Sequence, residues 1–164
     1  MDVICAPGDG EPIRRYNQAD PRFGTLPTLE DVRRTLALTQ YDTPPYNTFS
    51  AGSFRAVLEG YMDPQDPAQS TASMHNLVHV YCGGTLNNVL QSSNDPIFPA
   101  LHAYIDMIHE WWLRRNGEDK YPDDDANIPY GHRANDRIVP FFDPYTNKDM
   151  MKTAKAFGYD YEYF

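Results

Sequence analysis

The sequence is poor in cysteine, in basic residues and in long apolar runs, and each shortage excludes a class of protein. Two cysteines among 164 residues, Cys5 and Cys82, are too few for a multi-bridge disulfide framework and leave the compartment open. Fourteen basic against 23 acidic residues give a net charge of -9, which argues against nucleic-acid binding because such a surface repels phosphates. No apolar run approaches the roughly 18 residues of a membrane span, and the first ten residues lack the pattern of a secretory signal. The chain is therefore expected to be a soluble, single domain with its own core.

Turn-forming residues divide the chain into short helices joined by long irregular stretches. Prolines and glycines punctuate residues 1–27 and predict an irregular lead-in. Residues 28–40 and 53–60 are expected to form helices, each opened by a hydroxyl-bearing capping residue. At the end of the chain, FGYDYEYF alternates aromatic residues with glycine or acidic residues, which is the period of a half-buried strand.

Two further helices are predicted in the middle of the chain. One covers the stretch SMHNLVHVYC from residue 73 and ends at Gly83 and Gly84, which can adopt the backbone angles of a helix terminus. The other starts at Asp95, a natural N-cap followed by proline, and ends at Gly117. One face of this second helix is expected to carry Phe98, His102, Ile105, His109 and Trp112.

Histidine is scarce as well, yet two of the five histidines stand four residues apart, His75 and His79. Side chains at this spacing project from one face of a helix, so their nitrogens can converge on one metal ion. The pair could equally be two ordinary helix residues. A third ligand would have to be His102 or His109, and their separation of about 10.5 Å along a helix keeps one ion from binding both.

The residues around His102 resemble the second copper-binding region of the tyrosinase family. In that region H-N-x-x-x-H is followed by N-D-P-I-F and a further ligand histidine, and this chain has HNLVH at 75–79 and NDPIFPALH at 94–102. The resemblance to the animal tyrosinase and tyrosinase-related branch covers essentially the whole chain, through EPIRR, LALTQY, SFRAVLEGY, IPYGHR, VPFFDPY and FGYDYEY. It implies a type 3 copper site, where two coppers, each held by three histidines in a four-helix bundle, bind oxygen and oxidise phenols.

Carried onto this sequence, the family pattern assigns His75, His79 and His102 to the second copper. Asn76 and Glu59 match the family pair thought to orient the water that takes the phenol proton, so together they would supply a general base. The alternative for Glu59 is a solvated residue near a helix end, and the alternative for Asn76 is a polar side chain on the outer face.

Other positions near the site have two interpretations each. Val80 and Val89 fall where family members shape access to the second copper, although ordinary packing explains them equally well. Asp106, one turn beyond His102, is expected to support the ligands, either by satisfying the second nitrogen of an imidazole or by holding its helix in register. Its alternatives are an exposed position or a salt bridge with an arginine.

The two remaining histidines are expected outside the site. His109, beside two tryptophans, is expected to be packed or partly exposed, and His132 is expected in a turn. The family needs six histidine ligands, whereas only three histidines here occupy ligand positions and none precedes His75. We therefore expect residues 1–164 to be the C-terminal, second-copper half of a catalytic domain, without the first-copper half. The expected fold is mainly α, half of a di-copper four-helix bundle with long irregular connections and a short C-terminal β segment.

The resemblance leaves three functions to compare. The first is part of a tyrosinase-like oxidoreductase that oxidises monophenols and o-diphenols to o-quinones with oxygen, in pigment-type chemistry, using one copper in this half. The second is a catalytically inactive fragment that holds zinc or a single copper, and the third is an interaction module without metal. The partners implied are a phenolic substrate, oxygen and the first-copper half, without which the isolated chain should be inactive. The resemblance also implies the secretory pathway, the melanosome lumen or the extracellular space.

Overall fold

The computed structural model describes residues 12–16, 24–50, 52–61, 73–123, 126–138 and 145–162. Helices dominate these residues, in the order α1 (Leu29–Leu36), α2 (Phe54–Glu59), α3 (Met74–Cys82), α4 (Gly84–Asn87), the 3-10 helix η2 (Ser92–Asn94), α5 (Ile97–Asn116), and the 3-10 helices η3 (Asn147–Met150) and η4 (Ala154–Phe157). The β pairing within the described ranges is one isolated bridge between Arg137 and Thr146. The predicted mainly α fold is confirmed, and it is consistent with part of a helical bundle.

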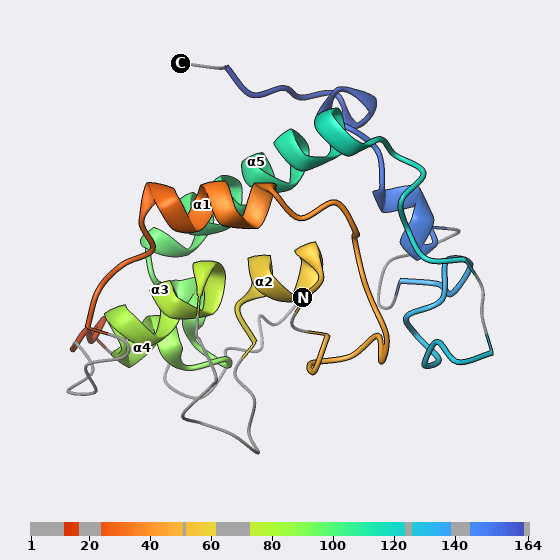
Figure 1. Cartoon of the computed structure of the whole chain (residues 1–164). Helices are drawn as coiled ribbons and strands as arrows, with labels where there is room; N and C mark the ends of the chain where they lie inside the picture. Colours follow the sequence, from red (N-terminus) through yellow and green to blue (C-terminus); the bar gives the residue numbers. More distant parts are fainter. Residues whose placement is uncertain are drawn as a thin grey trace, which may run out of the picture.

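Four of the helices contact one another in a closed circuit. Helix α2 contacts α1 and α3, and α5 contacts α1 and α3; Figure 1 shows α1 lying across α5 with α2 and α3 below. All four contribute to one apolar core, formed by Val32, Phe54, Leu58, Met74, Ile108, Trp112, Leu113 and Met151. The rings of Phe54 and Trp112, both fully buried, stack with centroids 4.6 Å apart. Burying a large apolar side chain contributes about 1.5–3 kcal/mol, so this core holds α2 and α5 in fixed positions.

Helix α1 begins where the sequence predicts and ends earlier. Thr28 and Asp31 form a reciprocal capping box at its start. The helix was expected to reach about Gln40, whereas it ends at Leu36. Backbone groups beyond this point are used in tertiary hydrogen bonds, since the carbonyl of Leu38 accepts from the Trp112 indole at 2.6 Å and that of Gln40 accepts from the Phe54 amide at 3.0 Å. These bonds compete with continuation of the helix.

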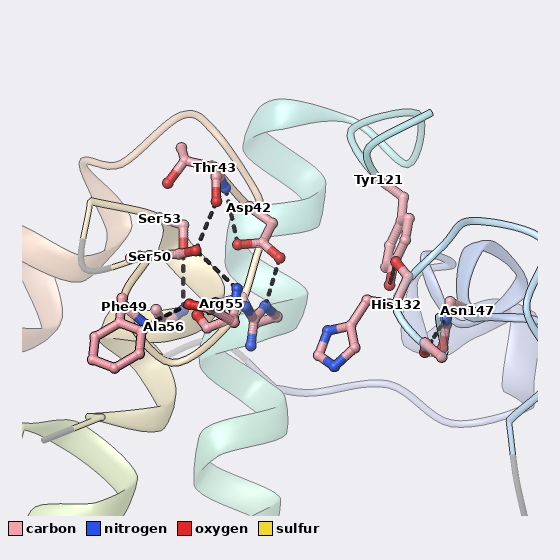
Figure 2. A network of polar contacts seen from close by, with 12 residues as sticks. Asp42, Thr43, Phe49, Ser50, Ser53, Arg55, Ala56, Tyr121, His132 and Asn147 are labelled. Atoms are coloured by element: carbon pink, nitrogen blue, oxygen red, sulfur yellow. Dashed lines mark hydrogen bonds and ion pairs between the residues drawn. The ribbon is translucent and has the colours of Figure 1, made fainter. Parts of the chain in front are cut away.

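The turn before α2 is held by a polar network. Arg55 Nε donates to Asp42 at 3.0 Å, and the buried hydroxyl of Ser50 donates to the Thr43 carbonyl at 2.7 Å (Figure 2). Ser53 caps α2 as predicted, with its hydroxyl accepting from the Ala56 amide. The network fixes where α2 starts, and with it the position of the last residue of the helix.

The end of α2 meets the start of α3 at a glycine. Gly60 has φ 76°, and a Cβ at this residue would lie 1.9 Å from the carbonyl oxygen of Ser73. The hydroxyl of Ser73 also donates to the Val57 carbonyl at 2.9 Å, and the side-chain nitrogen of Asn76 donates to the Gly60 carbonyl at 3.0 Å. Only a residue without a side chain allows this approach, which places the last residue of α2 beside the first turn of α3.

An N-terminal strap, residues 12–16, fastens α3, α4 and α5 together. The Tyr16 amide donates to the Cys82 carbonyl at 2.9 Å, and the Thr85 amide donates to the Arg14 carbonyl at 2.8 Å. Arg15 forms a two-point ion pair with Asp95, whose side chain is fully buried and also accepts from the Ile97 amide at 2.9 Å. Helix α5 begins at Ile97 with Pro96 as its N-cap, so the prediction of Asp95 as the N-cap is wrong by one residue, although its side chain accepts from the first amide of the helix.

The strand predicted at the C-terminus is wrong for the described residues 157–162. Phe157 ends η4, and residues 159–162 form no strand. Instead, the hydroxyls of Tyr159 and Tyr161 both donate to Asp106 on α5. The alternating pattern therefore serves an extended segment that lies against a helix rather than a sheet. Tyr163, Phe164 and Cys5 lie outside the described residues. Within the described ranges, no helix is long and apolar enough to cross a membrane.

The Arg15–Asp95 ion pair generates a first prediction. Asp95→Ala should lower the free energy of unfolding by about 2 kcal/mol, because it removes a charged acceptor that Arg15 and the Ile97 amide share. Urea denaturation of the chain measures this difference. Asp119→Ala is the matched control, since that carboxylate is 82% exposed beside Lys120, and should change stability by less than about 0.5 kcal/mol.

The same pair should make the difference depend on pH. The hydrogen bond from Arg15 holds the pKa of Asp95 below its usual range. A carboxyl group with a lowered pKa in the folded state stabilises the fold above its unfolded pKa of about 3.9, and this contribution is lost as the pH falls through the folded value. The deficit of Asp95→Ala should therefore shrink below about pH 4. A deficit that stays constant from neutral pH into this range would contradict the assignment.

Candidate metal centre

Three histidine side chains from two helices meet at one point. His75 and His79 lie on α3 and His102 lies on α5. The Nε2 atom of His75 is 2.9 Å from that of His79 and 3.1 Å from that of His102, and one nitrogen from each ring lies within 4.8 Å of the other two. Imidazole nitrogens at about 2.0 Å from one tetrahedral ion are roughly 3.3 Å apart. The three predicted ligands are therefore brought together at a spacing that fits one ion.

The second nitrogens of two rings determine which way their lone pairs point. His79 Nδ1 lies 2.5 Å from the Leu86 carbonyl, and His102 Nδ1 lies 2.8 Å from the Phe98 carbonyl. Because a carbonyl only accepts, both Nδ1 atoms carry a hydrogen, so the neutral form of each ring has its Nε2 lone pair directed at the centre. Burial lowers the pKa of His79 and so favours its neutral form. Two lone pairs directed at one point, with His75 Nε2 between them, fit a metal cation.

The third ring is held differently. The Nδ1 atom of His75 is buried without a hydrogen bond to any residue that the structure describes, and the Oε2 atom of Glu59 is 3.5 Å away. Glu59 is the last residue of α2 and its side chain is 41% exposed. The interaction with His75 holds the pKa of Glu59 below its usual range, so the carboxylate is ionised at neutral pH. Glu59 is thus partly solvated, as its alternative interpretation expected, and it also faces the histidines.

A cavity of about 400 Å³ opens on the cluster. Its lining comprises Glu59, His75, Asn76, His79, Leu86, Asn87, Val89, Ser92, Phe98 and His102. Asn76, half-buried, directs its amide nitrogen to Gly60, so it does not lie on an outer face. Val89 lines this cavity and is 93% exposed, so it is not packed against the described residues. Val80 is half-buried on α3 and is not part of this described lining.

A second cavity of about 490 Å³ shares two lining residues with the first. Glu59 and His102 line both cavities, while Tyr41, Arg55, Asp106 and His109 line only the second among the two linings. Glu59 and His102 therefore border both cavities.

Asp106, His109 and His132 lie outside the cluster of three histidines. Asp106 accepts from two C-terminal tyrosines, while the second nitrogen of His102 is taken by Phe98. These contacts favour the role of Asp106 in holding α5 over satisfaction of that imidazole. His109 packs as expected, with its ring stacked on Phe54 at 6.1 Å. His132 is exposed in a turn as expected, and its carbonyl accepts from Tyr121 (Figure 2).

Sequence reasoning missed the groups that hold the second nitrogens of the rings. The carbonyls of Leu86 and Phe98 carry no side-chain signal, because any residue provides the same acceptor. Ser92 was missed too, although its buried hydroxyl donates to the Leu86 carbonyl at 2.7 Å. The position of this serine in the sequence does not indicate that its hydroxyl contacts the Leu86 carbonyl.

Comparison with known proteins identifies close relatives. A family model described as the common central domain of tyrosinase matches residues 5–115. The 5,6-dihydroxyindole-2-carboxylic acid oxidase of Carassius auratus is 41% identical over 171 residues, covering 99% of this chain and 32% of the relative. The Gallus gallus protein of the same name is 42% identical, and the tyrosinase of Pelophylax lessonae is 40% identical; each match covers 99% of this chain and 31% of the relative. The chain thus spans about a third of the length of these relatives.

The geometry of the cluster predicts which histidines bind metal. His102→Ala should weaken binding of Zn²⁺ or Cu²⁺ by the chain about 100-fold, because loss of a ligand should cost at least as much as loss of a supporting partner. Competition with a chromogenic chelator measures the affinity. His132→Ala removes an exposed histidine outside the cluster and should leave the affinity unchanged. Equal weakening by both substitutions would mean that the metal binds elsewhere.

Proposed function

The chain belongs to the tyrosinase family, and on that premise we propose that it forms the second-copper half of an enzyme that oxidises monophenols or o-diphenols to o-quinones with oxygen. The observation that supports this most is the convergence of three imidazole nitrogens, from two helices, in a segment matched by the family model. Imidazole is a good ligand for copper, which the family implies. Pairs of copper ions, when bound, supply oxygen binding and the redox chemistry.

The residues of the chain would divide the remaining work. His75, His79 and His102 would hold the ion through Nε2. Glu59, ionised and 41% exposed, can accept a proton and pass it to solvent. The amide nitrogen of Asn76 is committed to Gly60, which leaves its oxygen to orient a water between itself and Glu59. This pair would take the phenol proton.

The cavity on the histidine cluster suits a single phenolic ring. Its volume of about 400 Å³ lies at the small end of the range for ligand sites. Val89 is an exposed apolar side chain at the edge of the cavity, and the ring centroids of Phe98 and His102 are 3.9 Å apart. An aromatic substrate would therefore contact apolar groups on its way to the centre. We propose that these two residues shape access, while Asp106 holds α5 and Val80 contributes by packing.

One feature supports the alternative of an inactive metal-binding fragment. The sequence has five histidines, and two of them, His109 and His132, lie outside the cluster, so it provides ligands for one ion of a pair. Three imidazoles also suit zinc. The copper enzyme therefore requires three more histidines from a first-copper half, which we propose as the partner. Because the chain belongs to the tyrosinase family, we also propose that the complete protein is located in the secretory pathway, the melanosome or outside the cell.

A hybrid enzyme tests the proposal. The matching segment of Bos taurus tyrosinase, which is 42% identical over 169 residues, is replaced by this chain. The hybrid should oxidise an o-diphenol and hydroxylate a monophenol, whereas the isolated chain should bind about one copper and oxidise neither faster than free copper does. Glu59→Gln in the hybrid should reduce monophenol hydroxylation about tenfold or more and diphenol oxidation much less, because a diphenol loses its protons more easily.

Glu30→Gln is the matched control, since this carboxylate is exposed on α1, and it should leave both rates unchanged. Equal loss of both activities in Glu59→Gln would show that Glu59 acts structurally. A hybrid that binds two copper ions and oxidises neither substrate would favour the inactive alternative. Rapid catechol oxidation by the isolated chain would refute the half-site proposal.

A further inference from the structure

The acceptor that holds His79 is itself held by a side chain from another element. Ser92 begins η2, is 6% exposed, and donates its hydroxyl to the Leu86 carbonyl at 2.7 Å. The same carbonyl lies 2.5 Å from His79 Nδ1, and the Ser92 oxygen lies 3.3 Å from that nitrogen. The three polar groups therefore form a closed triangle behind the ring.

The three rings differ in how their orientation is secured. His102 is held by a carbonyl four residues back on its own helix, so α5 orients it intrinsically. His79 depends on Leu86, which lies in α4, a helix of four residues that cannot satisfy its own carbonyls. The Leu86 carbonyl has two lone pairs, one for His79 Nδ1–H and one for the Ser92 hydroxyl. Without Ser92, nothing in this triangle fixes the direction of that carbonyl.

The backbone of Ser92 makes the arrangement rigid. Its amide donates to the Asn88 carbonyl at 2.7 Å, which closes the chain between α4 and η2. Shortly beyond η2, Asp95 is fixed by Arg15. The hydroxyl is therefore delivered by a segment that is anchored at both ends, so its contact with Leu86 is set by the fold.

We propose that Ser92 is a positioning residue for His79: by orienting the Leu86 carbonyl it keeps the hydrogen of His79 on Nδ1 and aims Nε2 at the metal position. The inference rests on the proposed function in one respect, that the three-histidine cluster holds a metal ion. Partners of this kind raise metal affinity about 10–100-fold. Ser92 also lines the cavity, so a direct contact with substrate is the competing role that the test has to separate.

The test uses the full chain with Ser92→Ala, Ser92→Thr and Ser93→Ala. Ser93 is the neighbouring serine of η2 and is exposed, so its alanine variant is the matched control. In the absence of any substrate, Ser92→Ala should weaken Zn²⁺ binding about tenfold, whereas the threonine variant, which retains a hydroxyl, should stay within about threefold of the wild type. Ser93→Ala should bind as the wild type does. Unchanged Zn²⁺ affinity in Ser92→Ala would overturn the proposal and leave substrate contact as the role of Ser92.

A second readout needs no metal. In the metal-free chain, nitrogen NMR of the imidazole rings should show the His79 hydrogen on Nδ1 in the wild type, in Ser92→Thr and in Ser93→Ala, and a mixture of the two tautomers in Ser92→Ala. A single, unchanged tautomer in Ser92→Ala would refute the positioning role even if Zn²⁺ binding fell. If the wild type binds no Zn²⁺ and the tautomer of His79 still changes between the wild type and Ser92→Ala, the metal site and the proposed function are refuted. The role of Ser92 in orienting His79 is then supported.

Discussion

The approach of α3 to α5 that brings three imidazole nitrogens to one point is the constraint on which the rest of the structure depends. The Nε2 atom of His75 lies about 3 Å from the Nε2 atoms of His79 and His102, and ring nitrogens this close require a proton or a cation between them. The fold maintains this arrangement from two directions. The Phe54–Trp112 stack and the α2–α3 junction at Gly60 act on one side, and the strap of residues 12–16 acts on the other.

Each histidine is supported in a different way, and the differences have consequences. The ring of His102 is held by a carbonyl of its own helix and that of His79 by a carbonyl on another helix, while the Nδ1 atom of His75 faces a carboxylate 3.5 Å away. The contact of Glu59 with His75 couples the proposed base to the metal site. A change in the position of His75 on metal binding would therefore alter the surroundings of Glu59, the carboxylate that we propose as the proton acceptor.

Local signals in the sequence predicted the parts of the fold that local forces determine. Thr28, Ser53 and the glycine ends of the helices placed α1, α2, α3 and α5, because capping acts over three or four residues. The early end of α1 was not predictable, since it depends on Trp112, 74 residues away from Leu38. The C-terminal strand failed for a related reason: an alternating pattern fits a sheet or a helix surface, and only the tertiary partner Asp106 decides between them.

In the candidate site, too, the sequence predicted some residues and missed others. Spacing and family motif predicted that His75, His79 and His102 converge with Glu59 beside them, because the side chains themselves form the pattern. The groups that orient the rings are backbone carbonyls and one buried serine, whose roles arise only when α4 and η2 fold against α3. A sequence pattern can predict the candidate ligand side chains, whereas the groups that orient them are known only once the chain has folded.

X-ray absorption of the chain loaded with one equivalent of copper tests the central claim most directly. The account predicts one ion with three imidazole nitrogens at about 2.0 Å, and the loss of one of these nitrogens from the spectrum when His79 is replaced by alanine. A copper ion surrounded by carboxylate or water oxygens, with a spectrum that the His79 substitution leaves unchanged, would contradict it.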